Sequence, residues 1–346
     1  MKGAEVQELW VAIERDAALQ SRSGYVLRRA SIGCNVDFFL AVRCPDLQRA
    51  LVLRVPADVL PEVRKLPETR GLEVSVERLH DDVAGTASIV VQLRAANFSE
   101  IFVSFSTILV NRVCAAMSPA HAAGELLAQL FQWQKFLDAR SEGLGEEEQR
   151  GLYGELYILR RLVQMMGAAS LAGGWVGPAG AAQDFRFGRE VAIEVKTSIG
   201  SEPQAVKING ERQLDDRNLG RLYLVCLSID RAAGSGETLP DLVAWIRDSL
   251  KNHPVELNDF EQSLLEFGYL KSHEARYRLQ GFALRHERCF RVQEGFPRIT
   301  EAGLPSGVGR VEYRVALAGC TQFAVAFEQI VTALVATVGK RSGLEQ

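Results

Sequence analysis

The stretch QDFRFGREVAIEVKTSIG, residues 183–200, places two acids and a lysine on what reads as two short strands joined by a tight turn. Side chains alternate along a strand, so in a strand over 191–197 Glu194 and Lys196 share one face and their apolar neighbours share the other. The apolar face can pack against a core. The stretch therefore predicts a strand that carries a carboxylate beside an ammonium group.

The position of the first acid depends on the length of the turn around Gly188. A two-residue turn made of Gly188 and Arg189 points Asp184 away from Glu194. A turn of odd length, or a bulge, brings both carboxylates to one face, because side chains change face with every residue. Both geometries are compatible with the sequence.

Two carboxylates and a lysine are suited to metal-assisted phosphodiester hydrolysis. Carboxylates hold Mg²⁺ or Mn²⁺, the bound water becomes a better nucleophile, and the lysine orients it. Of the eight lysines, only Lys196 has an acid two residues before it. The alternative interpretation is a surface ion pair between Glu194 and Lys196 on an edge strand, which is common and contributes little stability.

Composition narrows the class of protein. The chain has 346 residues, 47% of them hydrophobic, and a formal net charge of −3, so nucleic-acid contacts must come from a local patch. No GxSxG, HExxH or P-loop pattern occurs, and the six cysteines lack zinc-ligand spacing. We expect these cysteines to be buried thiols in a reducing cytoplasm, without a signal peptide or membrane segment.

Hydrophobic periodicity predicts four segments: a β-rich lobe over 1–117, a connecting helix within 118–145, an α/β core over 146–250 and an α+β lobe over 251–346. In the first lobe, strands are expected at 25–32, 36–44, 49–55, 72–79, 87–94 and 100–110. In the core we expect a helix over 146–167, a Gly-rich loop over 171–183, the strand pair, a short helix around 210–218, a strand over 222–229 and a helix over 239–252. Strands at 277–285, 289–296 and 311–317 and a helix at 323–339 complete the last lobe.

The run from about Leu152 to Ile229 resembles the core of the PD-(D/E)xK nuclease superfamily, which has the restriction-endonuclease-like fold. A closer resemblance, over most of the chain, is to a bacterial family of PD-(D/E)xK-motif proteins associated with restriction-modification and phage-defence gene clusters. It is carried by GLYGELYIL (151–159), WVGPAGAAQDF (175–185), EVKTS (194–198), QL (213–214) and FPRITEAGLPSGVGRVEY (296–313). The implied fold is a mixed sheet flanked by helices.

The resemblance implies roles for individual residues. Asp184 and Glu194 would be metal ligands, with the Val195 carbonyl as a further ligand, and Lys196 would position the attacking water. Glu155 would be the acid of the preceding helix. It lies on that helix's apolar stripe, which also fits a helix-edge glutamate whose stem packs while its head reaches water.

At two positions, both of them glutamines, the match of this chain to the superfamily pattern is less direct. Gln183 replaces the proline that gives the motif its name. Gln213 matches a glutamine that faces the site in some related nucleases, and it is equally compatible with a solvated helix position. Both are candidates for residues that support the site.

Arginines interleaved with aromatic residues at 274–298 form the best local phosphate-binding candidate, with Arg276, Arg278, Arg285 and Arg288 as its predicted DNA contacts. A solvated strand face is the alternative. Trp175 is a further candidate that could stack on a base or anchor its loop in the core.

The sequence and the resemblance together predict a cytoplasmic Mg²⁺- or Mn²⁺-dependent DNA endonuclease of a restriction-type or phage-defence system. Its expected partners are DNA, a second copy of the chain, and helicase, methylase or ATPase subunits. The alternative is an inactive nuclease fold that binds DNA or serves as a scaffold in a defence complex. No membrane partner is expected.

Overall fold

The computed structural model describes residues 3–20, 23–31, 33–60, 66–67, 71–94, 98–139, 143–167, 174–200 and 205–342. Residues 140–142 of the predicted connecting segment and 171–173 of the predicted Gly-rich loop lie outside these ranges. The chain forms two compact units, Met1–Glu142 and Gly143–Gln346. No helix among the described residues is both long and apolar enough to cross a bilayer.

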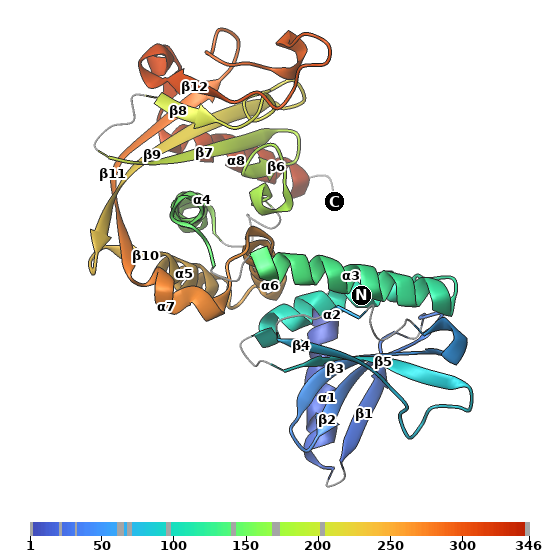
Figure 1. Ribbon diagram of the computed structural model, residues 1–346. Helices are drawn as coiled ribbons and strands as arrows, with labels where there is room; N and C mark the ends of the chain where they lie inside the picture. The colour runs from blue at the N-terminus through green and yellow to red at the C-terminus, as the bar shows by residue number, and fades with distance from the viewer. Residues whose placement is uncertain are drawn as a thin grey trace. The chain divides into compact units, whose positions relative to one another are not determined.

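The first unit is an antiparallel sheet with helices packed on it (Figure 1). The sheet order is β1-β2-β3-β5-β4, with strands β1 (Gly24–Arg29), β2 (Asp37–Cys44), β3 (Gln48–Pro56), β4 (Leu72–Glu77) and β5 (Thr86–Leu93). Helices α1 (Gly3–Ala18) and α2 (Ser99–Cys114) contact β2, and α3 (Pro119–Ala139) contacts β3. A short 3₁₀ turn, η1 (Ala57–Val59), follows β3. Five of the six strands predicted in this part of the chain form this sheet.

Two expectations for this unit are wrong. Residues 100–110, predicted as a strand, belong to helix α2. Their aromatic and β-branched content is typical of strands, but the buried side chains Phe102, Phe105 and Leu109 recur at helical spacing and face one core. Cys34 and Cys114, predicted as thiols, form a disulfide, whereas the other four cysteines are buried and free.

The second unit is built on a mixed sheet of order β10-β11-β9-β7-β6, with β13 paired to the C-terminal part of β11. Strands β7 and β9 are parallel, and the other pairs are antiparallel. The bounds are β6 (Phe185–Phe187), β7 (Val191–Ile199), β9 (Arg221–Ala233), β10 (Glu237–Thr238), β11 (Gln280–Val292) and β13 (Ala324–Val325). A separate ribbon pairs β8 (Ala205–Ile208) with β12 (Tyr313–Ala316).

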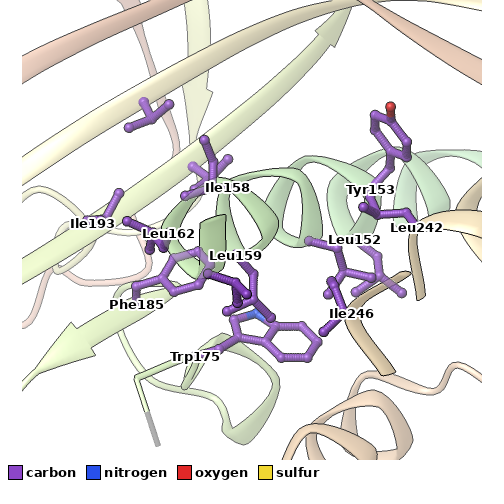
Figure 2. Close-up of a cluster of buried hydrophobic side chains, with 14 of the residues drawn as sticks. Leu152, Tyr153, Ile158, Leu159, Leu162, Trp175, Phe185, Ile193, Leu242 and Ile246 are labelled. Atoms are coloured by element: carbon purple, nitrogen blue, oxygen red, sulfur yellow. The ribbon is translucent and has the colours of Figure 1, made fainter. Parts of the chain in front are cut away.

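Helices cover one face of this sheet around a central helix, α4 (Glu146–Met166), which contacts β7, α5 and α8. Leu152, Leu159 and Trp175 point into the hydrophobic cluster between these helices and the sheet (Figure 2). The opposite face packs Leu222 and Leu224 against the β8–β12 ribbon. The remaining helical elements are α5 (Leu239–Leu250), α6 (Pro254–Phe267), α7 (Glu274–Tyr277), α8 (Phe327–Ser342), η5 (Gly177–Ala179), η6 (Lys271–His273), η7 (Glu301–Gly303) and η8 (Leu317–Phe323).

The structure differs from the sequence expectations at three places in this unit. Residues 210–218, predicted as a short helix, form turns between β8 and β9. The strands predicted at 277–285 and 289–296 are one strand, β11, which crosses a register shift between Leu284 and His286. Because β11 pairs along most of β9, residues after 250 complete the core sheet instead of forming a lobe of their own.

Two glycines of α4 provide a matched test of how closely this helix approaches β7. A Cβ on Gly154 would lie 1.8 Å from Thr197 Oγ1, whereas a Cβ on Gly151 would meet nothing within 4 Å. We expect Gly154→Ala to lower the free energy of unfolding by about 1–3 kcal/mol, because the helix must move away from the strand. Gly151→Ala should raise it by about 0.5–1 kcal/mol through helix propensity. Urea unfolding of both variants measures the difference, and equal effects would contradict this packing.

Candidate active site

The turn between β6 and β7 has three residues, Gly188 to Glu190, because Phe187 pairs with Val191. Gly188 adopts a φ of 65°, which glycine reaches without strain. The odd turn length continues the register so that Asp184 stands opposite Glu194. Of the two geometries left open by the sequence, the structure has the one that places both acids on the same face.

Asp184 directly precedes β6, which pairs with β7 only as far as Ile193. Asp184 therefore lies beside the part of β7 that has no β6 partner, which we call the open edge of β7. Its Oδ2 accepts a 2.7 Å hydrogen bond from the Val195 amide. Its own carbonyl accepts hydrogen bonds from the amides of Val176 and Gly177, at 2.9 and 3.0 Å. The aspartate is therefore fixed between the loop before it and the strand beside it, and the Val195 amide is engaged by a carboxylate oxygen.

Glu194 and Lys196 are buried neighbours on β7. Glu194 is 0% exposed, and neither of its carboxylate oxygens has a hydrogen-bond partner among the described residues. The Lys196 Nζ lies 2.7 Å from Glu194 Oε1 as an ion pair, although the contact is not aligned as a hydrogen bond. The surface ion pair considered from the sequence is excluded, since the Lys196 side chain is only 15% exposed.

Glu155 reaches the same place from α4. Its side chain is buried, and its Oε2 accepts a 2.7 Å hydrogen bond from Trp175 Nε1. The point where a Cβ of residue 177 would lie is 3.1 Å from Asp184 Oδ1 and 3.3 Å from Glu155 Oε2. Gly177 thus leaves room where two carboxylates converge, and the solvated helix-edge interpretation of Glu155 does not hold.

Burial shifts the ionisation of this cluster. Removal from water, followed by repulsion from Asp184, raises the pKa of Glu194 to about 8 and the pKa of Glu155 well above its usual value. Burial also raises the pKa of Asp184. Burial alone would lower the pKa of Lys196, but Glu194 and Asp184 outweigh it and raise the pKa. The site therefore has more carboxylates than its one lysine can neutralise.

The donor chemistry fits a hard divalent cation. Oxygen ligands suit Mg²⁺ and Mn²⁺, and the unpartnered oxygens of Glu194 and the space at Gly177 lie within this carboxylate cluster. Among the described residues, no three acid, histidine or cysteine side chains are already grouped as a complete metal site. Main-chain oxygen, water and substrate phosphate would complete the coordination, as is usual for Mg²⁺.

The two glutamines join the site to the turn at 209–214. Lys196 Nζ donates a 3.0 Å hydrogen bond to Gln213 Oε1, which also accepts one from the Asn209 amide. Gln183 is buried, and its Nε2 donates to the carbonyls of Arg212 and Gln213 at 2.8 and 3.3 Å. The residue in place of the motif's proline thus ties the first acid's strand to the turn that holds the lysine.

The segment 296–313 braces that turn from the outside. Arg298 Nη1 donates to the Leu214 carbonyl at 2.8 Å, and Glu301 accepts from Arg212 at 2.6 Å. The Val311 amide donates to Glu211 Oε2 at 3.0 Å. These contacts were not predicted, although the segment itself stood out in the sequence through its resemblance. The segment lies beside the turn at 209–214, which holds Lys196 through Gln213. This position explains why 296–313 and the site motifs belong to the same pattern although they are far apart in sequence.

Trp175 and four arginines of this unit were predicted to contact DNA. Trp175 is 7% exposed, so the expectation that it could stack on a base is wrong, and it anchors its loop in the core. Arg278 pairs with Asp241 at 2.8 Å, and Arg285 pairs with Asp230. Arg276 and Arg288 also have interaction partners. The DNA-binding role of these four arginines stays a prediction.

Comparison with known proteins places the chain by its sequence. No curated protein and no solved structure matches it. One family model, described as "Putative PD-(D/E)XK family member, (DUF4420)", matches residues 6–318, nearly the whole chain. That match includes every residue of the buried carboxylate cluster. The chain therefore belongs to this PD-(D/E)XK family, and its mixed sheet flanked by helices is consistent with that family's nuclease-like fold.

Proposed function

We propose that this protein is a Mg²⁺- or Mn²⁺-dependent endonuclease that hydrolyses phosphodiester bonds of DNA. The observation that carries the proposal is the meeting of Asp184, Glu194 and Lys196 at the open edge of β7. Glu194 is fully buried there without a hydrogen-bond partner among the described residues. Burying a carboxylate that has an ion pair with Lys196 but no aligned hydrogen bond costs stability, so a functional use is the simplest reason for its presence.

In this mechanism Asp184 and Glu194 would hold the cation, with Glu155 and the Val195 carbonyl as further oxygen donors. When bound, Mg²⁺ supplies a more acidic water and neutralises charge on the phosphate. Lys196 donates a hydrogen bond to the attacking water and stabilises the negative charge that develops. Gln213 holds the Lys196 Nζ, so the lysine is oriented before the substrate arrives.

The substrate and setting are proposed from the family and from the sheet. In the strand register, Cys226 of β9 stands opposite both Lys196 of β7 and Arg288 of β11. Arg288 therefore lies in the same row of the sheet as Lys196, where it can contact a neighbouring phosphate. We propose that the protein acts in the cytoplasm as part of a restriction-type or phage-defence system, although a disulfide such as Cys34–Cys114 is uncommon in that compartment. A second copy of the chain would allow both strands to be cut, and helicase, methylase or ATPase subunits would supply target selection.

A second candidate is a nuclease fold that serves as a DNA-binding or scaffold subunit without cutting. Ion pairing of Arg278 and Arg285 to acids of the same unit favours the scaffold form of this candidate, because paired arginines have less charge to offer DNA phosphates. The net charge of −3 points the same way. The intact set of acids and lysine favours cleavage, because a scaffold has no need of it.

The deciding experiment compares wild type with Asp184→Asn in plasmid cleavage and in calorimetric titration of Mn²⁺. We expect the wild type to bind Mn²⁺ and nick DNA, and the variant to lose about 100-fold or more in cleavage, because it lacks one ligand charge. Asp248→Asn is the matched control, since Asp248 is 74% exposed on α5. If the wild type binds DNA but neither binds Mn²⁺ nor cuts, the second candidate replaces this one, in its DNA-binding form.

A further inference from the structure

Trp175 makes a polar contact that the sequence did not suggest. Its indole Nε1 donates a 2.7 Å hydrogen bond to Glu155 Oε2, between a loop residue and a helix residue 20 positions apart. Both side chains are less than a tenth exposed. Such a bond is not automatic for a buried tryptophan in this chain, because the buried Trp10 Nε1 has no hydrogen-bond partner among the described residues.

The indole itself is held on several sides. Its ring lies 5.8 Å from the Phe260 ring of α6, and residue 175 forms an isolated β-bridge with Phe185. Helix α6 also contacts η5, the turn that follows Trp175. Figure 2 shows the Trp175 ring among apolar side chains, beside Leu159 of α4. The donor is therefore fixed by core packing and cannot easily follow a moving acceptor.

The accepting oxygen and an oxygen of Asp184 lie beside the same point of the backbone, at Gly177. Glu155 Oε2 and Asp184 Oδ1 both lie within 3.3 Å of the position where a Cβ of Gly177 would stand. Two buried carboxylates repel each other, so a free Glu155 side chain would move away from Asp184. An indole N–H donates and cannot accept, so it holds an acceptor in this position without offering an alternative pairing.

We propose that Trp175 is a positioning residue that keeps Glu155 Oε2 beside Asp184, and through Glu155 shapes the site for a divalent cation. The inference rests on the proposed function and deepens it. By this inference, the loop that holds Trp175 before β6, and the contact of Trp175 with Phe260, support the metal site. Trp175 touches neither the cation nor the substrate, and it acts only through the glutamate.

A double-mutant cycle tests this action through Glu155. Trp175→Phe keeps a ring against Phe260 but removes the N–H, and Glu155→Leu removes the acceptor at similar size. We expect Trp175→Phe to weaken Mn²⁺ binding about 10-fold in the wild-type background and not at all in the Glu155→Leu background. Trp245→Phe is the matched control, because Trp245 lies in the same unit against Arg160 and should leave Mn²⁺ affinity unchanged.

Indole ¹⁵N–¹H spectra provide a readout that is independent of metal and activity. The chain has four tryptophans, and the Trp175 signal is the one lost in Trp175→Phe. Without metal, that signal should move in Glu155→Leu, and the other three should not. An unmoved signal, or equal effects of Trp175→Phe on Mn²⁺ affinity in both backgrounds, would overturn the inference. A wild type that binds no Mn²⁺ would overturn the proposed function and this inference together, whereas unchanged affinity in Trp175→Phe would overturn this inference alone.

Discussion

Lys196→Ala is expected to lower the rate of Mg²⁺-dependent plasmid cleavage by about 100- to 1,000-fold while DNA binding stays within about threefold of wild type. The variant removes a positive charge that lies 2.7 Å from Glu194 and is oriented by Gln213. Phosphodiester hydrolysis builds negative charge on the phosphate and needs an oriented water, and a buried ammonium serves both needs. Single-turnover cleavage measures the chemical step apart from binding.

Lys207→Ala is the control for this prediction. Lys207 is on β8, which contacts β7 from the separate ribbon, but its side chain is 54% exposed and pairs with Glu312 at the surface. Its removal should leave the single-turnover rate unchanged. Equal rates for Lys196→Ala and wild type would show that the lysine has a structural role only, and a fall in both variants would point to a general loss of charge near DNA.

The second large effect concerns the dependence of stability on pH. The folded-state pKa of Glu194 is raised to about 8, first by burial and then by Asp184, whereas an unfolded glutamate titrates near 4.5. Between these values the folded state keeps a proton that the unfolded state has lost, so the free energy of unfolding falls as pH rises. At one proton this is at most about 1.4 kcal/mol per pH unit. We expect a total fall on the order of 3 kcal/mol between pH 5 and pH 8 in the absence of metal.

Glu194→Gln should remove most of that fall, because glutamine resembles the protonated acid at every pH. Urea unfolding with a chelator present should find the variant close to wild type at pH 5 and more stable at pH 8. Glu190→Gln, a change at an exposed residue of the adjoining turn, should leave the wild-type slope intact. A wild type whose stability is flat or rises between pH 5 and pH 8 would show that Glu194 is already ionised in the fold.

Local patterns predicted the elements that carry the site, and they failed where tertiary contacts decide. The alternation in β7 and the periodicity of α4 are properties of neighbouring residues, so Glu194, Lys196 and Glu155 could be assigned to their elements from the sequence. The strand-like composition of 100–110 misled because a shared core overrides β propensity there. The single strand β11 was split at its register shift, where the apolar pattern breaks.

The site could be predicted only in part, for the same reason. A sequence shows that Asp184 and Glu194 stand near one turn, but not that the turn has three residues, because pairing along the strands sets that number. The contacts of Gln183 with the turn at 212–213, and of Trp175 with Glu155, join residues 20 or more positions apart. No local pattern encodes such contacts, and only the resemblance of the segments hinted that they belong together.

The late position of the bracing segment has a consequence during synthesis. The chain leaves the ribosome from its N-terminus, and domains fold as units once their residues are available. Strand β9 lacks its complete β11 neighbour until residue 292 has emerged. The turn at 209–214, which holds Lys196, lacks its contacts with Arg298 and Glu301 until shortly afterwards. A nascent or prematurely terminated chain that already contains every acid of the cluster therefore still lacks the framework that aligns them. Under the proposed nuclease function, such a chain would not yet be able to cut the cell's own DNA.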